Sequence, residues 1–422
     1  MRAATLRSAN VSRLGLHLPR AMQVVTAVPD YERRLTLMLF VVAPVLQLLI
    51  RFGLGSQHAA QSVVKGWDDL VILCAMVIAL PSLPARVSRL GNGWIGPVGL
   101  TLFVLLMGIK VSAVDWPRVD FFWETLGMEL KPIYYLVAAA AIYLRVGRLH
   151  LEHWLGRFVF FACMMVLSYL IQIAMGLGAL ARAQAVEEAN YDGFILGMGL
   201  LICYHLRDRV PARTWAILLL ATVLTLSRTG MAALLLIAAV VCVRHRRFGW
   251  LVAGAIALVP AAIAIYVTRA NGASSNQFDR FRMWQSFFLT VRQWSPFEWM
   301  FGMMPGVPIR YYDPFIQFFI DFQSVGAHGL AGLHPFNYHG MHIRYIITWG
   351  LLGVAIALGT MALSLKRGGW LLGLMWLYVL IQGMSMGVIY LTTVAVPALL
   401  MIFELWMIGA DRWQEARTPR TA

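Results

Sequence analysis

Charged residues are scarce in this chain of 422 residues: Asp, Glu, Lys and Arg make up 13% of it, apolar residues 60%, and the mean hydropathy is +0.70. A soluble domain needs a charged surface, so this composition excludes one. The four cysteines all lie inside apolar runs, at no metal-ligand spacing: Cys74, Cys163, Cys203 and Cys242. They predict small buried side chains and no disulfide framework.

Two further features are missing from the chain. Residues 1–34 are rich in arginine but contain no apolar core of their own, so they predict a retained cytoplasmic tail and no signal peptide. Because these residues contain no signal peptide, the first apolar segment is expected to perform the targeting. The chain also contains no internal repeat of the kind that marks many secondary transporters.

Apolar runs dominate the remainder. A bilayer-spanning helix needs roughly 20 apolar residues, and on that basis the sequence predicts an all-α, polytopic membrane protein with about twelve transmembrane helices. The expected segments are 35–50, 69–85, 94–113, 125–144, 156–178, 191–206, 214–227, 229–243, 249–267, 341–363, 369–386 and 388–410. Nine of them fall within 35–267 and three within 341–410.

Basic residues indicate the orientation, because Lys and Arg accumulate in short cytoplasmic loops. With both termini inside, residues 1–34 and 411–422 included, most of the 35 Lys and Arg residues are cytoplasmic. The net charge of +15 is thus an orientation signal and an attraction to anionic membrane lipids, and it does not indicate nucleic-acid binding.

One connection, residues 268–340, is far longer than the others and rich in aromatic residues. We expect it to be a large extracytoplasmic loop with amphipathic helices. One of these should begin near Asp279, because apolar residues then recur at helical spacing through Trp294. Such a helix would rest on lipid or roof a cavity.

Three arginines outside the cytoplasm have two interpretations each. Arg228 lies at the turn between two short apolar segments, where it either snorkels to the interface or holds a phosphate with its planar fork of donors. Arg280 and Arg282 open the predicted loop helix, as a solvated face or as part of an anion site.

Histidines cluster where the loop returns to the membrane. His334, His339 and His342 are each candidates for a structural hydrogen bond or for a neutral base near pH 7. A zinc site is disfavoured, because no Asp, Glu or Cys is near in sequence and Arg344 would repel a cation. The loop also shows no acidic pair of the glycosidase kind, although Asp313 is suited to binding a sugar.

Four local patterns resemble the bacterial O-antigen ligase and O-antigen polymerase superfamily of membrane glycosyltransferases. His339-Gly340 is followed by Gly350 and Gly353 inside an apolar helix, similar to the family's histidine motif, although Gly340 replaces its usual Asn or Ser. Residues 224–230 resemble its Ser-Arg turn, residues 280–284 its loop-helix opening, and Asn190-Tyr191 the beginning of one of its helices.

The resemblance implies glycan transfer from undecaprenyl diphosphate to a sugar hydroxyl at the periplasmic face of the inner membrane, without a cofactor or metal. His339 would be the catalytic base, and Arg228, Arg280 and Arg282 would bind the diphosphate. Weaker candidates are Asn190, Tyr191, His334, His342, Arg344 and Asp313.

The acceptor decides between the members of this superfamily. A ligase transfers to lipid A core oligosaccharide, and the single large loop and the chain length favour it. A polymerase extends a lipid-linked glycan, and an oligosaccharyltransferase acting on protein Ser is a variant. A lipid-linked glycan transporter is the alternative that is not an enzyme.

Overall fold

The computed structural model describes residues 28–55, 57–82, 122–176, 183–186, 188–247, 249, 279–304, 307, 309, 335, 338 and 340–417. All regular secondary structure in these ranges is helical and none is strand, which confirms the all-α prediction. Several expected features lie outside the described residues: the segment 94–113, nearly all of 249–267, and the side chains of His334, His339 and Asp313.

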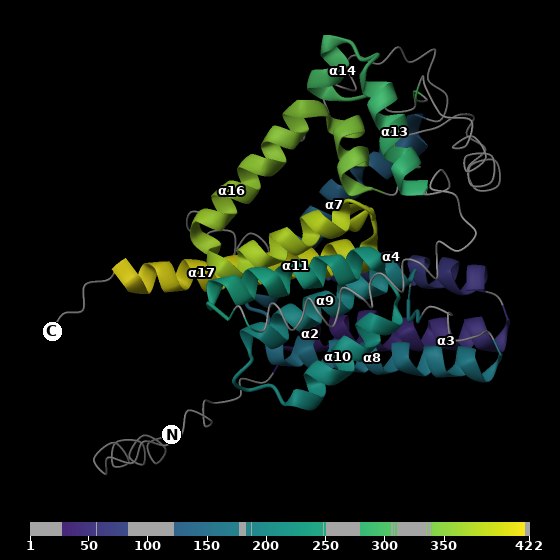
Figure 1. Ribbon diagram of the computed structural model, residues 1–422, viewed down its shortest axis with the longest axis vertical. Helices are drawn as coiled ribbons and strands as arrows, with labels where there is room; N and C mark the ends of the chain where they lie inside the picture. The colour runs from purple at the N-terminus through teal and green to yellow at the C-terminus, as the bar shows by residue number, and fades with distance from the viewer. Residues whose placement is uncertain are drawn as a thin grey trace.

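The helices fall into a bundle of roughly aligned rods and a smaller group standing to one side of it (Figure 1). The bundle contains α2 (Asp30–Leu37), η3 (Met38–Val42), α3 (Ala43–Gly53), α4 (Gln57–Ala79), η4 (Leu80–Ser82), α8 (Leu151–Ala174), α9 (Ala189–His205), α10 (Ala212–Leu224), α11 (Arg228–Arg244) and α17 (Thr392–Arg417). Two long elements belong to both parts: α7 (Phe122–Val146) and α16 (Met341–Gly383), whose residues 135–142 and 372–379 pack in the core of the bundle. The smaller group contains α13 (Asp279–Val291), α14 (Pro296–Phe301) and the first part of α16, and η9 (Val388–Tyr390) precedes α17.

Four stretches of the described chain are long and apolar enough to cross a membrane: Asp30–Gly53, Leu151–Ala174, Met341–Gly383 and Thr392–Arg412. Two shorter apolar helices are Ala212–Leu224 and Thr229–Arg244. Many large apolar side chains on these helices are exposed, among them Leu170 and Leu220. Exposed apolar faces on long helices are expected where lipid is the solvent, so the chain is a membrane protein.

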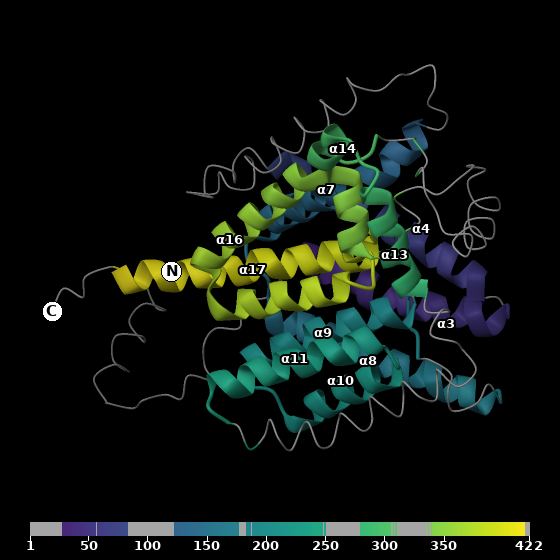
Figure 2. The same cartoon turned by 45° about the horizontal axis from the view of Figure 1, so that its top comes forward.

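Helix α16 corrects the prediction of a continuous helix over 341–363. Gly350 has φ 63° and ψ −167°, and Gly369 has φ 71° and ψ −170°, so neither is helical. Only glycine adopts this backbone region readily. The prediction that Gly350 lies inside a helix is therefore wrong: α16 consists of three helices that change direction at the two glycines (Figures 1 and 2).

A close approach of backbones explains the glycine at 350. A Cβ atom there would lie 2.5 Å from Met300 O of α14 and 2.4 Å from the amide nitrogen of Gly302, the C-cap of that helix. The amide of Met303 also donates to Ile347 O at 2.7 Å. Hydropathy does not reveal such a break, because the residues on both sides of it are equally apolar.

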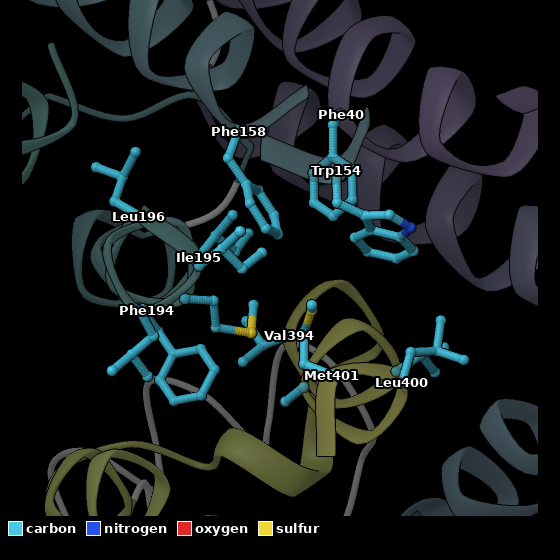
Figure 3. Close-up of a cluster of buried hydrophobic side chains, with 14 of the residues drawn as sticks. Phe40, Trp154, Phe158, Phe194, Ile195, Leu196, Val394, Leu400 and Met401 are labelled. Atoms are coloured by element: carbon cyan, nitrogen blue, oxygen red, sulfur yellow. The ribbon is translucent and has the colours of Figure 1, made fainter. Parts of the chain in front are cut away.

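The main core lies between α9, α17, η3 and α8 (Figure 3). Phe40 contacts Trp154 and Phe158 edge to face, with ring centroids 5.7 and 5.0 Å apart. Phe194 stacks on Tyr378 at 4.9 Å. Aromatic contacts of this kind add to the stabilisation from burial.

One end of the bundle, here called the basic end, collects the connections that carry most of the described basic residues. There Glu404 of α17 accepts hydrogen bonds from Arg148 Nε, from Leu149 N and from the Tyr143 hydroxyl. Arg209 pairs with Glu152, and the Arg244 guanidinium lies 4.3 Å from the Trp370 ring centroid. The opposite ends of α9, α11 and α17 are therefore remote from this cluster.

The prediction that all four cysteines are buried is wrong for Cys74 and Cys163, and Cys242 is only partly buried. Cys74 and Cys163 are exposed on the outer faces of α4 and α8, whereas Cys203 is buried. All four are free thiols. An apolar run does not reveal which of its faces meets lipid and which meets protein.

A glycine pair tests the packing of α9 on α16. A Cβ added at Gly197 would lie 1.9 Å from the buried Tyr378 hydroxyl oxygen, whereas one added at Gly66 meets nothing within 4 Å. We expect Gly197→Ala to destabilise the fold by about 1–3 kcal/mol through overpacking. Gly66→Ala should stabilise α4 by about 0.5–1 kcal/mol. Thermal unfolding of both variants in detergent measures the two shifts, and equal shifts would contradict the packing described.

Candidate functional site

Four segments meet at the end of the bundle opposite the basic end, and we call this region the junction. The connection 384–391 between α16 and α17 bonds to three of the other elements. Ser385 Oγ donates to Thr229 Oγ1 at 2.7 Å, Gly387 N to the Tyr191 hydroxyl at 3.4 Å, and the amide of Met341 to Met386 O at 3.0 Å. The first residues of α9, α11 and α16 are thereby held around one connection.

Helix α11 begins at the junction with a capped N-terminus. Ser227 is its N-cap, and its hydroxyl accepts the Gly230 amide at 3.2 Å. The predicted Ser-Arg turn is therefore a helix start, with Arg228 as the first helical residue. The Arg228 side chain lies outside the described residues. A helix N-terminus carries a partial positive charge, which favours an anion beside it.

The start of α9 packs on this turn. A Cβ at Gly193 would lie 3.4 Å from Thr225 Oγ1 and 3.8 Å from Ser227 Cβ. Asn190 and Tyr191 belong to the first turn of α9, and Asn190 is buried. The structure thus brings these two weaker candidates to the junction, together with the backbone of Arg228.

Close packing also accounts for Gly340, where the family motif usually has Asn or Ser. Gly340 is the N-cap of α16, and a Cβ there would lie only 3.3 Å from Met384 O. His342 is used structurally, because its Nε2 lies 2.7 Å from Leu380 O. His339 itself is outside the described residues, but the next residue in the chain is fixed at the junction.

Helix α13 begins at Asp279, as the aromatic spacing predicted, and ends at Val291. Its buried face, Met283, Phe287 and Val291, forms one apolar cluster with Ile343 and Ile347 of α16. The apolar residues that recur at helical spacing on this face of α13 therefore pack on α16. Arg280 and Arg282 occupy its first turn, and their side chains lie outside the described residues.

A hydrogen bond connects α13 with the neighbour of His339. The Ser286 hydroxyl and the Tyr338 hydroxyl are 3.0 Å apart, and both residues are buried. Burial raises the pKa of Tyr338 to about 12, while the hydrogen bonds from Ser286 and Thr290 lower it. Tyr338 therefore stays protonated at neutral pH and can hold this contact.

Arg344, a weaker site candidate, is buried and has partners inside the protein. Its Nη2 donates to Met128 O of α7 at 2.8 Å and lies 3.9 Å from Glu129 Oε1. Its Cζ lies 3.6 Å from the centroid of the Tyr390 ring. Thr348, one turn further along α16, donates to Glu129 Oε2. Among the described residues, Arg344 Nε and Glu129 Oε1 have no hydrogen-bond partner, so the two groups attract each other by charge without a direct hydrogen bond.

Sequence reasoning missed a second buried acidic group next to the junction. Thr393 donates to Asp68 Oδ2 at 2.7 Å, and Thr392 donates to Asp69 Oδ1. Tyr135 shares a hydrogen bond of 2.7 Å with Thr392. Asp68 is buried, whereas Asp69 is exposed. An acid inside an apolar run was the signal that could have indicated this site, because a buried acid needs a partner.

The described residues contain no group of three or more His, Cys, Asp or Glu with the geometry of a metal site. Comparison with known proteins gives no family: no family model matches the sequence, and no curated protein matches it. The site is therefore interpreted from its own geometry and from the motif resemblance.

The Ser286 and Tyr338 contact can be tested by a double-mutant cycle. We expect Ser286→Ala and Tyr338→Phe each to lower the free energy of unfolding, with a coupling energy of about 1 kcal/mol. Combining Ser286→Ala with Tyr143→Phe at the basic end should be additive, because those residues share no partner. Additivity in the first cycle would mean that the hydroxyl contact does not contribute.

Proposed function

We propose that the protein is an O-antigen ligase: a metal-independent, inverting glycosyltransferase of the bacterial inner membrane. It transfers a glycan from undecaprenyl diphosphate to a sugar hydroxyl of lipid A core oligosaccharide. About twelve spans place both termini in the cytoplasm and residues 268–340 in a large periplasmic loop. The active site then lies at the periplasmic face.

One observation carries this proposal. Three motifs separated by up to 150 residues in the chain, those at 190–191, 227–230 and 340, border the same connection 384–391. Their convergence is what a composite site requires, and nothing in their sequence spacing demands it. The junction also lies opposite the basic end. The basic end is expected to face the cytoplasm, because Lys and Arg accumulate in short cytoplasmic loops.

The chemistry follows from the residues assigned to each role. A ring nitrogen of His339 takes the proton from the acceptor hydroxyl while that oxygen attacks the anomeric carbon. A new C–O bond forms as the bond from the anomeric carbon to the phosphate oxygen breaks. Undecaprenyl diphosphate leaves with the negative charge, which Arg228, Arg280 and Arg282 stabilise. A single displacement inverts the anomeric centre.

Two alternative functions, a polymerase and a transporter, place different requirements on the protein. A polymerase of lipid-linked glycan would use the same donor site and a second donor molecule as acceptor. A transporter would need ionisable residues along a pathway through the membrane. The buried acids Glu129 and Glu404 belong to two separate clusters, Glu129 bonded to Thr348 near the junction and Glu404 to Arg148 at the basic end, which favours structural roles.

The base can be identified with a histidine pair. We expect His339→Ala to lower the transfer rate by about 10²–10⁴-fold, the contribution of a general base. His342→Ala should lower thermal stability, since it loses the contact with Leu380 O, while transfer persists. Purified protein, a lipid-diphosphate-linked glycan and lipid A core, with and without EDTA, provide the assay. Full activity in His339→Ala together with loss in His342→Ala assigns the role to His342 instead.

The acceptor distinguishes ligase from polymerase in the same assay. Growth of the lipid A core product supports the ligase. Growth of the donor's own glycan in the absence of lipid A core supports the polymerase. If neither product forms while the protein releases donor across a vesicle membrane, the transporter alternative is correct.

The diphosphate role of Arg228 has its own test. We expect Arg228→Gln to lower kcat/KM for the donor by about 10–100-fold, the loss of a charge-assisted bidentate contact. Arg228→Lys should recover only part of this, because lysine lacks the planar fork. Arg213→Gln is the matched control, since Arg213 is an exposed arginine near the start of α10. An equal loss in Arg213→Gln would point to general charge and not to a phosphate contact.

A further inference from the structure

The first helix of α16, residues 341–349, is a short rod that connects the junction with α14. At the N-terminal end of the rod the Met341 amide donates to Met386 O at 3.0 Å. Near its C-terminal end Ile347 O accepts the Met303 amide at 2.7 Å. These end contacts are between backbone groups. Between them, one side of the rod faces α7 and η9 with polar side chains.

We infer that the buried Glu129–Arg344 pair is a positioning device that sets this rod, and with it its N-cap Gly340, relative to the junction. The inference rests on the proposed function, because it assigns a role to the pair in aligning the base. Arg344 and Glu129 are positioning residues, since both act through the rod and neither is directed at the donor.

The geometry fixes the rod in three directions. Arg344 reaches the α7 backbone at Met128 O, its guanidinium lies on the ring of Tyr390 in η9, and Thr348 bonds to Glu129 one turn further on. Because residues four apart share a helix face, both anchors act on the same side of the rod. Rotation of the rod would separate both from α7.

Burial makes this pairing selective for one position. Arg344 is 7% exposed and Glu129 is 2% exposed, so a displaced rod would leave two charges without partners in surroundings of low dielectric constant. The apolar cluster of Phe287, Ile343 and Ile347 also contacts the rod, but its attraction is not directional. The contacts of Arg344 and Thr348 with α7 are directional and therefore set the alignment.

The competing role for Arg344 is a direct contact with the diphosphate. That role predicts a weakened affinity for the donor when the arginine is replaced. The positioning role predicts slower chemistry at unchanged donor affinity, since a misplacement of about 1 Å is enough to slow a reaction about 100-fold. The two roles therefore separate in KM and kcat.

The experiment uses full-length protein in lipid nanodiscs and two graded changes. Arg344→Gln removes the charge, and Thr348→Val removes one hydrogen bond with little change of shape. Thr348→Ser keeps the hydroxyl and is the matched control. Spin labels on cysteines introduced at Gly127, where a Cβ meets nothing within 4 Å, and at Ile346, partly buried on the rod, report the distance of the rod from α7. The four native cysteines are replaced in all variants.

We expect Arg344→Gln to lower kcat by about 10–100-fold with donor KM within about two-fold, and to broaden the distance distribution. Thr348→Val should lower kcat by about 3–10-fold, and Thr348→Ser should match the wild type. A raised donor KM at unchanged kcat overturns the inference in favour of a diphosphate contact. An unchanged distance distribution in Arg344→Gln also overturns it, whatever happens to kcat.

Failure of the proposed function is separately visible. If the wild type transfers no glycan, the proposed function is wrong and the role in aligning His339 fails with it. The distance measurement does not depend on transfer, so it still decides whether the pair fixes the rod.

Discussion

The need to satisfy buried polar groups organises this structure, because lipid offers neither hydrogen bonds nor screening. Apolar faces hold the helices together but give weak registry, since lipid competes equally well for them. The registry comes from a few buried acids. Glu32 binds His150 and Trp154, Glu404 binds Arg148 and Tyr143, and Asp192 accepts the amides of Ala185 and Val186. Each acid joins segments whose contact apolar packing alone would leave adjustable.

The sequence predicted the class and much of the helical content, because apolar run length and aromatic spacing directly reflect helices in lipid. The helix from Asp279 is one example. The break at Gly350 was not predictable in this way, since its cause is the α14 backbone against which it packs. Hydropathy reports the solvent of a segment and contains no information about a distant neighbour. The number of spans stays a prediction, since four stretches of the described residues are long and apolar enough to cross a membrane.

The candidate site was predictable in part. Local patterns located the turn at Ser227 and the position of Gly340, and the structure places both beside one connection. Their partner, residues 384–391, carries no motif and was not expected. Arg344 was grouped with the site by its closeness to His342 in sequence, yet its side chain turns to Glu129 of α7. An arginine in a sequence does not show whether its guanidinium binds a substrate or an acid inside the protein.

The bond between Met341 and Met386 closes a ring of chain that includes all of α16. The Met386 carbonyl that closes this ring follows the whole of α16 in the chain. The ring therefore closes only after every residue of α16 has been synthesised, and assembly of the junction comes later than synthesis of α9 and α11, which border it. Premature termination before residue 386 would leave the first residues of these helices without the connection that holds them together.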